Sequence, residues 1–257
     1  DIGALEIEDF RVAAALAGEE ARLDGVGYLH MGGRALDISL NATGDGEKDI
    51  VAIRALREGD TLSINALIRS TADGVIATIA DVGGPLYVEA TGAGPLDGYK
   101  LSYDAALGAY GELKGAFAGD LEKMQAINFE AKALLGGKFE NTTKIVGPEA
   151  TIAGAFRPSS AGGAVEVEKF QSDLGTASGA ITWRNAGKAL ARLEIEASAR
   201  LNENWRPDIR PYIGDEISAK GSLTPGKDDY ALTADIAATY FDATLHAMAT
   251  DLKDYLR

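Results

Sequence analysis

The chain has 257 residues and contains no cysteine, which excludes a disulfide framework and a thiolate metal site. Its 25 Lys and Arg against 39 Asp and Glu give a formal net charge of −14, so the phosphate backbone of a nucleic acid would be repelled. No stretch approaches the roughly 20 apolar residues that a membrane-spanning helix needs, so we expect any membrane anchor to lie outside this chain.

Much of the chain alternates apolar and polar residues. Because side chains in a β-strand point to opposite faces in turn, each such segment predicts a strand with aliphatic side chains on one face and polar ones on the other. Glycine-containing turns separate the segments, which predicts an all-β chain built as a long antiparallel or solenoid-like sheet. The clearest segments are residues 36–43, 62–66, 127–133, 193–201 and 232–236.

Two regions depart from this alternation. Apolar residues in 73–81 follow a helical period, and residues 205–212 contain two prolines, too many for a central strand. We therefore predict short helical inserts near 74–82 and 206–213. The C-terminal run 243–252 fits a strand or a helix, and we favour a strand that ends near Ala249. Nothing in the composition divides the chain, so we expect residues 1–257 to form a single continuous segment.

The period of two also predicts which side chains share the apolar face of the sheet. Their polar neighbours, such as Asn128 and Glu194, are expected to face water on the other side. The predicted lining residues are Leu36, Ile38, Leu40, Leu62, Ile64, Ile68, Leu101, Tyr103, Leu107, Phe117, Ile127, Phe129, Leu193, Ile195, Leu232 and Ile236.

Residues that could support catalysis are few. The two histidines, His30 and His246, fit exposed strand positions better than catalytic bases. Residues 92–95 lack the Lys-Ser/Thr pair of a phosphate-binding loop and lead into another strand. Glu194 and Glu196 share a strand face as glycosidase carboxylates might, but alternating Glu is also the ordinary way to keep a sheet soluble. We therefore expect no enzyme activity, no metal and no cofactor.

Three segments resemble one known family. Residues 2–12 with 21–27, residues 84–101, and residues 212–223 are similar, in order and spacing, to segments of the TamB/AsmA-like family, which includes the inner-membrane subunit of the translocation and assembly module. Tyr99 stands where the family usually has tryptophan.

This resemblance implies a fold and a role. Family members have a twisted β-sheet folded lengthwise into an open apolar trough, a β-taco. They lie in the periplasm, anchored to the inner membrane, and support outer-membrane biogenesis by moving phospholipid between the membranes. The chain would then be an interior piece of a longer periplasmic protein that binds phospholipid acyl chains, with a TamA-type outer-membrane barrel as a partner of other regions. No family residue is catalytic.

Two alternatives remain open at this point. The sheet could instead be a platform that pairs its edge strand with a strand of an outer-membrane β-barrel protein during assembly. It could also be a ligand-free structural β-solenoid, whose facing side chains fill the space that a lipid would need.

Overall fold

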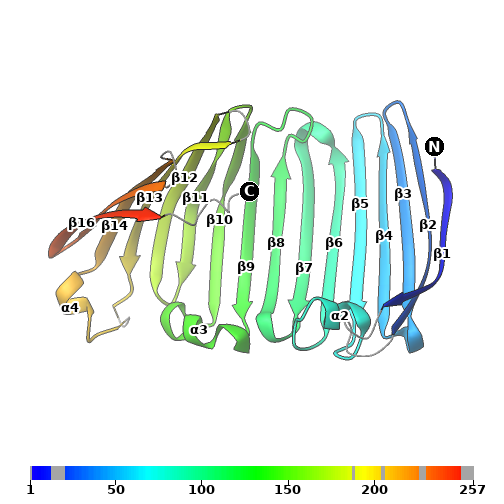
Figure 1. Cartoon of the computed structure of the whole chain (residues 1–257), viewed down its shortest axis with the longest axis horizontal. Coiled ribbons are helices and arrows are strands. Elements are labelled where there is room, and N and C mark those ends of the chain that lie inside the picture. The colour runs from blue at the N-terminus through cyan, green and yellow to red at the C-terminus, as the bar shows by residue number, and fades with distance from the viewer. Residues whose placement is uncertain (1, 13–20, 187–188, 204–205, 226–229, 250–257) are drawn as a thin grey trace. The chain divides into compact units, whose positions relative to one another are not determined.

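The computed structural model describes residues 2–12, 21–186, 189–203, 206–225 and 230–249 (Figure 1). Contacts divide the chain into two compact units, so each is described by itself. The first unit comprises Asp1–Lys123 and Glu130–Thr143, and the second comprises Met124–Phe129 and Lys144–Arg257. Whether they form the single continuous segment expected from the sequence stays a prediction.

The first unit is an antiparallel sheet in which the strand order follows the chain. Short turns join most neighbouring strands, as the glycine spacing predicts. The strands are β1 (Ile2–Val12), β2 (Ala21–Gly32), β3 (Ala35–Gly44), β4 (Asp49–Glu58), β5 (Thr61–Ser70), β6 (Leu86–Pro95), β7 (Tyr99–Leu107), β8 (Gly111–Gly119) and β9 (Ile127–Leu135), whose first three residues belong to the second unit.

The second unit is also an antiparallel sheet in chain order. Its last strand confirms the predicted C-terminal strand as far as Ala249, the last residue that the structure describes, and both units confirm the all-β class. The strands are β10 (Glu149–Ser159), β11 (Gly162–Ser172), β12 (Gly175–Ala186), β13 (Ala189–Leu201), β14 (Glu216–Pro225), β15 (Tyr230–Ala238) and β16 (Phe241–Ala249).

Short helices interrupt the strands. The predicted inserts near 74–82 and 206–213 contain α2 (Val75–Ile79) and α4 (Arg210–Ile213). The helix α3 (Glu140–Val146) was not predicted, because its seven residues carry no clear apolar stripe. Four 3₁₀ turns complete the description: η1 (Asp45–Glu47), η2 (Leu96–Gly98), η3 (Gly108–Tyr110) and η4 (Gly137–Phe139).

The inserts reveal an internal repeat of four strands. Each insert ends in a hydrophobic residue followed by a glycine with positive φ. The carbonyl of that hydrophobic residue accepts a backbone N–H hydrogen bond from a later turn, the one that joins the second and third strands after the insert. The repeating groups are Val82–Gly83 with Ala109 (2.7 Å), Val146–Gly147 with Asp173 (3.0 Å), and Ile213–Gly214 with Thr239 (3.1 Å). The strands β6–β9 and β10–β13 are therefore equivalent groups, and a helical insert follows each group.

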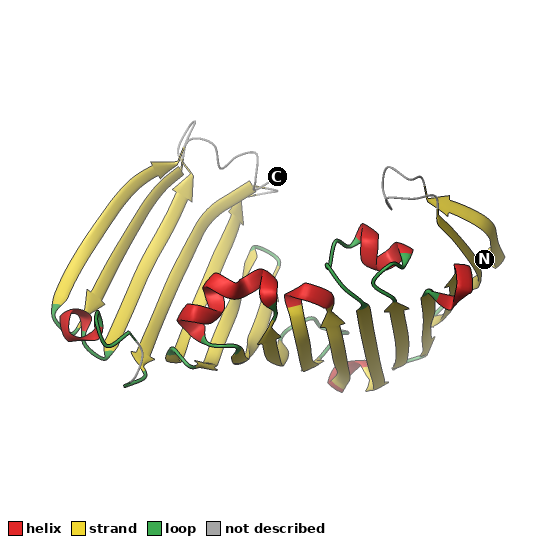
Figure 2. Ribbon diagram, turned by 90° about the horizontal axis from the view of Figure 1, so that it is seen from below, coloured by secondary structure: helices red, strands yellow, loops and turns green. Residues whose placement is uncertain are grey.

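The best-buried cluster of the first unit lies where the α2 insert packs on the sheet (Figures 1 and 2). Ala77 and Val82 of the insert join Leu86, and Ile68 and Val88 of the adjacent strands pack against them. The insert therefore covers one end of these strands, and the cluster does not extend to their middle.

Candidate functional site: an apolar face

The strand register of the first unit gathers apolar side chains on one face, because residues directly opposite each other on paired strands share a face. Three rows cross β2 to β8 without a charged member, and we call them the apolar face of the first unit. They are Leu29, Ile38, Ala55, Ile64, Gly92, Leu101 and Phe117; Gly27, Leu40, Ile53, Ala66, Ala90, Tyr103 and Gly115; and Gly25, Ala42, Val51, Ile68, Val88, Ala105 and Leu113.

Ten of the predicted lining residues belong to this unit, and the register places all of them on this face. Seven lie within the three rows, while Leu36, Leu62 and Leu107 continue the face toward the strand ends. With strands about 4.8 Å apart, a row of seven strands is roughly 29 Å long. The face is therefore an extended strip that runs across the strands.

The second unit repeats this arrangement across β10 to β16. The rows are Phe156, Val165, Ile181, Ile195, Gly221, Ala234 and Leu245; Gly154, Val167, Gly179, Ala197, Ala219, Ile236 and Ala243; Ile152, Phe170, Ala177, Ala199, Ile217, Ala238 and Phe241; and Pro158, Gly163, Trp183, Leu193, Leu223, Leu232 and Ala247. These rows form the apolar face of the second unit, and they contain no charged residue.

The remaining predicted residues fall on this second face. Leu193, Ile195, Leu232 and Ile236 lie within its rows. A Cβ on Gly154 would stand 2.9 Å from Cζ of Phe129, so the Phe129 ring lies over Gly154. Ile127 is two residues earlier on the same strand and shares the face of Phe129.

Sequence alternation missed several members of these faces. Val51 and Ile53 lie in β4, where the continuous apolar run Ile50–Ile53 hides the period of two. In β11 a bulge after Val167 shifts the period, so that Phe170 rather than Lys169 shares the face of Val165. These residues are assigned to the apolar face by the register of the paired strands, which the sequence pattern alone does not give.

The opposite face is less polar than predicted. Leu56 of β4 pairs with Asp37 of β3 and therefore lies on that face, and Val26 lies there with 55% of its surface exposed. The apolar side chains of β4 thus point to both faces, as expected of a strand that is half buried on each side.

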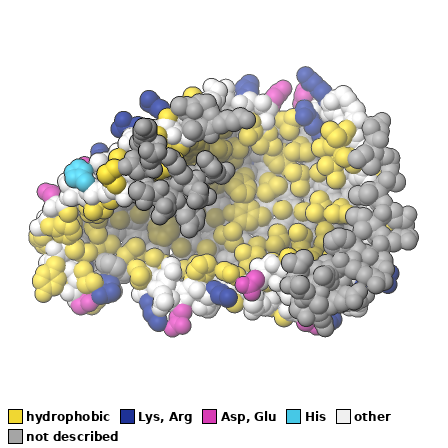
Figure 3. All heavy atoms as spheres, viewed as in Figure 1, with side chains coloured by type: hydrophobic (Ala, Val, Ile, Leu, Met, Phe, Trp, Pro, Cys, Tyr) yellow, Lys and Arg dark blue, Asp and Glu magenta, His cyan; other side chains and the backbone are white. Residues whose placement is uncertain are grey.

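The apolar faces are open to solvent in places. Phe117 is 42% exposed in the first unit, and Ile195 and Leu245 are 41% and 52% exposed in the second. A shallow hollow of about 280 Å³ lies on the face of the second unit among Val165, Phe170 and Ile195. Figure 3 shows hydrophobic side chains covering the visible face, with charged side chains at its borders. Exposed apolar surface of this extent is typical of a binding surface.

Aromatic rings lie flat on this surface because glycines stand beneath them. A Cβ on Gly163 would be 2.5 Å from Cζ2 of Trp183, and one on Gly115 would collide with the Tyr103 ring. The Trp183 ring also stacks on Phe156, with centroids 6.1 Å apart. The absence of a Cβ at these glycines therefore lets the rings lie close to the sheet and form a flat apolar surface.

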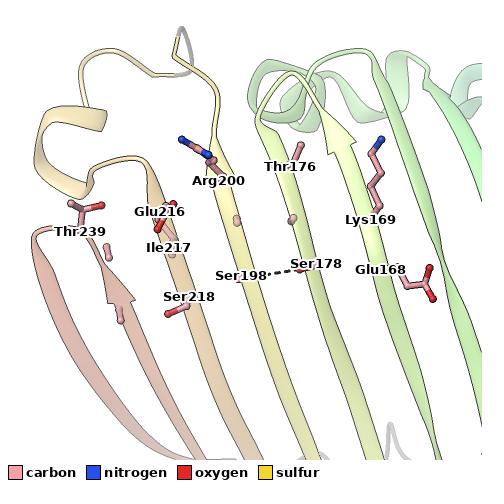
Figure 4. A pocket seen from close by; sticks show the side chains of 14 residues that line it. Glu168, Lys169, Thr176, Ser178, Ser198, Arg200, Glu216, Ile217, Ser218 and Thr239 are labelled. Carbon is pink, nitrogen blue, oxygen red and sulfur yellow. Dashed lines mark hydrogen bonds between the residues drawn. The ribbon is translucent and has the colours of Figure 1, made fainter.

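The opposite face of the second unit carries a larger hollow, of about 720 Å³ (Figure 4). The Ser178 and Ser198 hydroxyls lie 3.3 Å apart along it, and Arg200 and Glu216 occupy directly opposite positions on β13 and β14. Lys169 and Glu168 line another side. Because its cations and anions balance, this hollow fits a solvated sheet surface better than an ion-binding site.

Several titratable groups of the second unit form exposed ion pairs. Lys220 Nζ lies 2.8 Å from Glu196 Oε1, and this hydrogen bond raises the pKa of Lys220. Glu194 likewise pairs with Arg192 at 2.8 Å. His30 and His246 are both exposed. Within the described residues, no three His, Asp or Glu side chains come together in a group that could hold a metal ion.

Among the helices of the described segments, none has the length and hydrophobicity required to cross a membrane. No protein-family model, curated protein or solved structure matches the chain.

Proposed function

We propose that this chain is a lipid-binding conduit segment, whose apolar faces carry acyl chains of phospholipids between the inner and outer membranes. One observation carries the proposal: rows of apolar side chains cross seven strands in each unit, and several members are open to solvent. A closed core would bury these side chains against others.

The energetics suit transport. Each buried CH₂ contributes about 0.8 kcal/mol relative to water, so a sixteen-carbon chain gains on the order of 10 kcal/mol by lying on such a surface. The gain relative to a bilayer interior is near zero, since both surroundings are apolar. A floor flattened by glycines such as Gly115 and Gly163 offers no deep trap along the way.

The proposal extends to the setting implied by the family resemblance. The faces would line an open trough of a periplasmic protein that is anchored to the inner membrane by segments outside this chain. A TamA-type outer-membrane barrel would be a partner of the longer protein. In this role the chain binds and guides lipid without catalysis.

A second candidate function is a platform for assembly of outer-membrane β-barrel proteins. The chain-ordered antiparallel sheet supports it, because strand pairing adds an extended segment to such a sheet through backbone hydrogen bonds. The lipid conduit is favoured because strand pairing would use backbone groups at one edge and would not require apolar rows over seven strands. The same rows argue against a ligand-free solenoid.

Cross-linking of a phospholipid that carries a photoreactive group on its acyl chain tests the conduit. Phe129→Asp places a carboxylate on the apolar face, where an unpaired charge costs several kcal/mol, so we expect capture to fall at least tenfold in the folded variant. Asn128→Asp adds the same charge to the other face of β9 and should leave capture within twofold. A folded Phe129→Asp protein with full capture would favour the strand-pairing platform.

A further inference from the structure

The apolar face of the first unit carries one cation. In the described strands β2 to β8, only Asp49 and Arg57 bring charge to this face. Asp49 is 1% exposed and is enclosed by the α2 insert. Arg57 lies at the opposite end of β4, directly between Leu36 of β3 and Leu62 of β5. The rows of the second unit contain no such residue.

The contacts of Arg57 leave most of its guanidinium available. Its Nε donates a 3.0 Å hydrogen bond to the carbonyl of Gly59 in the β4–β5 turn. The two terminal nitrogens have no partner among the described residues. Asp60, the acidic residue within this turn, accepts a hydrogen bond from Arg34 Nη1 at 2.9 Å. The Arg57 guanidinium is therefore oriented by the Gly59 carbonyl but has no carboxylate ion-pair partner among the described residues.

We infer that Arg57 binds the anionic headgroup of an amphiphile whose alkyl chain lies on the apolar face of the first unit. This inference rests on the proposed function and adds a headgroup class to it. A long Arg side chain covers apolar surface with its methylenes and keeps its guanidinium in water, and the free terminal nitrogens match the oxygens of a phosphate or carboxylate. The neighbouring Leu36 and Leu62 provide the apolar surface where such a chain begins.

The position of Arg57 also orients the ligand. At the other end of the same strand, Asp49 would repel an anion and is covered by α2. Between the two ends lie Val51, Ile53 and Ala55, which are apolar. An anionic headgroup is therefore directed to the end of β4 that carries Arg57. The alkyl chain of the ligand then lies on the apolar rows between Arg57 and Asp49.

Two ligands with the same alkyl chain test this inference. Lauroyl-lysophosphatidylglycerol is anionic and lauroylglycerol is neutral, and calorimetry below their aggregation concentrations measures the affinity of each for the chain. Arg57→Gln should weaken the anionic ligand roughly three- to tenfold and leave the neutral one within twofold. Arg54→Gln is the matched control, because Arg54 lies on the opposite face of the same strand; it should change neither affinity by more than twofold.

The outcomes separate this inference from the proposed function. If the wild-type chain binds both ligands and Arg57→Gln binds them equally well, or if Arg54→Gln is weakened as much, the Arg57 assignment is wrong and the conduit stands. If inorganic phosphate alone displaces the anionic ligand at equal concentration, the site recognises free phosphate, which also overturns it. If neither ligand binds the wild-type chain, the proposed function fails too.

Discussion

Ser70 and Asp49 face each other across β5 and β4, and the Ser70 hydroxyl donates a 2.6 Å hydrogen bond to Oδ1 of Asp49. The same carboxylate accepts the backbone N–H groups of Val75 at 2.9 Å and Ile76 at 3.0 Å. Ser70 Oγ in turn accepts the N–H of Ala77. The sheet thereby satisfies the first N–H groups of α2, which a short helix leaves without partners.

Asp49→Asn should loosen this junction. An asparagine amide has one acceptor oxygen and presents an NH₂ group to the backbone donors, so at least one buried N–H loses its partner. We expect the free energy of unfolding to fall by about 1.5–3 kcal/mol in denaturant titrations. Asp97→Asn removes a charge from an exposed turn and should change it by less than about 0.5 kcal/mol. Equal losses in the two variants would contradict the role of Asp49.

Gly154 and Gly221 occupy comparable places in the first strands of successive repeats but have different surroundings. A Cβ on Gly154 would collide with the Glu166 carbonyl and the Phe129 ring, whereas the nearest atom to a Cβ on Gly221 is 3.3 Å away. Gly154→Ala should therefore destabilise the chain by about 1–3 kcal/mol. Gly221→Ala should change the stability by less than about 1 kcal/mol, because the Thr233 carbonyl has to shift by only a few tenths of an ångström and alanine loses less backbone entropy on folding. Thermal melts that rank the two variants in the opposite order would refute this account.

Tyr99 has a buried hydroxyl without a hydrogen-bond partner among the described residues, and burial raises its pKa. Tyr99→Phe removes that hydroxyl and keeps the ring. We expect the free energy of unfolding to stay the same or to rise by up to about 1–2 kcal/mol. Tyr28→Phe is the comparison, since the Tyr28 hydroxyl donates to both carboxylate oxygens of Asp37 at 3.1 Å. That variant should lose stability. A clear loss in Tyr99→Phe would show that its hydroxyl has a partner in solution.

Asp73 makes a pH-dependent link between the α2 insert and Lys48, the residue directly before β4. Hydrogen bonds from Lys48 and Thr71 lower the pKa of Asp73 to about 2. Because the folded pKa lies below the usual value of 3.8, the link is fully present above that value and is lost as the pH falls toward 2. Lys48→Met should raise the Asp73 pKa toward 3.8 in a carboxyl NMR titration. An unchanged titration would mean that Lys48 does not hold Asp73 in solution.

Alternation predicts the faces of most strands correctly, because a period of two is a local property. Leu36, Ile38 and Leu40 share a face whatever lies beside them. Their neighbours across the sheet depend on register, which is set by turns and bulges. The bulge in β11 moves Phe170 onto the apolar face, and no count of alternating residues shows it.

The four-strand repeat escaped the sequence analysis for a related reason. Its signal is sparse: a hydrophobic residue before glycine at Val82–Gly83 and Val146–Gly147, and a proline near the end of the following strand at Pro95 and Pro158. These positions recur at intervals of 64 and 63 residues, which follow from 146 − 82 and 158 − 95. Arg57 was missed because a single cation in a strand usually faces water; only its pairing with two leucines places it on the apolar face.

Trp183 offers a direct report on what reaches the apolar face of the second unit. Its ring lies over Gly163 and stacks on Phe156, beside Leu193. The chain has two tryptophans, so Trp205→Phe leaves Trp183 as the single reporter.

Bromine atoms quench tryptophan only at contact distance. A phospholipid with a brominated acyl chain should therefore quench Trp183 in the Trp205→Phe background, while the same lipid without bromine should not. Ile195 lies on the neighbouring strand β13, one row away from Trp183. Adding Ile195→Asp should reduce the quenching, because an unpaired carboxylate in an apolar site costs several kcal/mol and so disfavours binding of the acyl chain there. Glu194→Gln, on the other face of β13, should leave it unchanged. Quenching that persists in a folded Ile195→Asp variant would mean that the acyl chain reaches Trp183 by another surface.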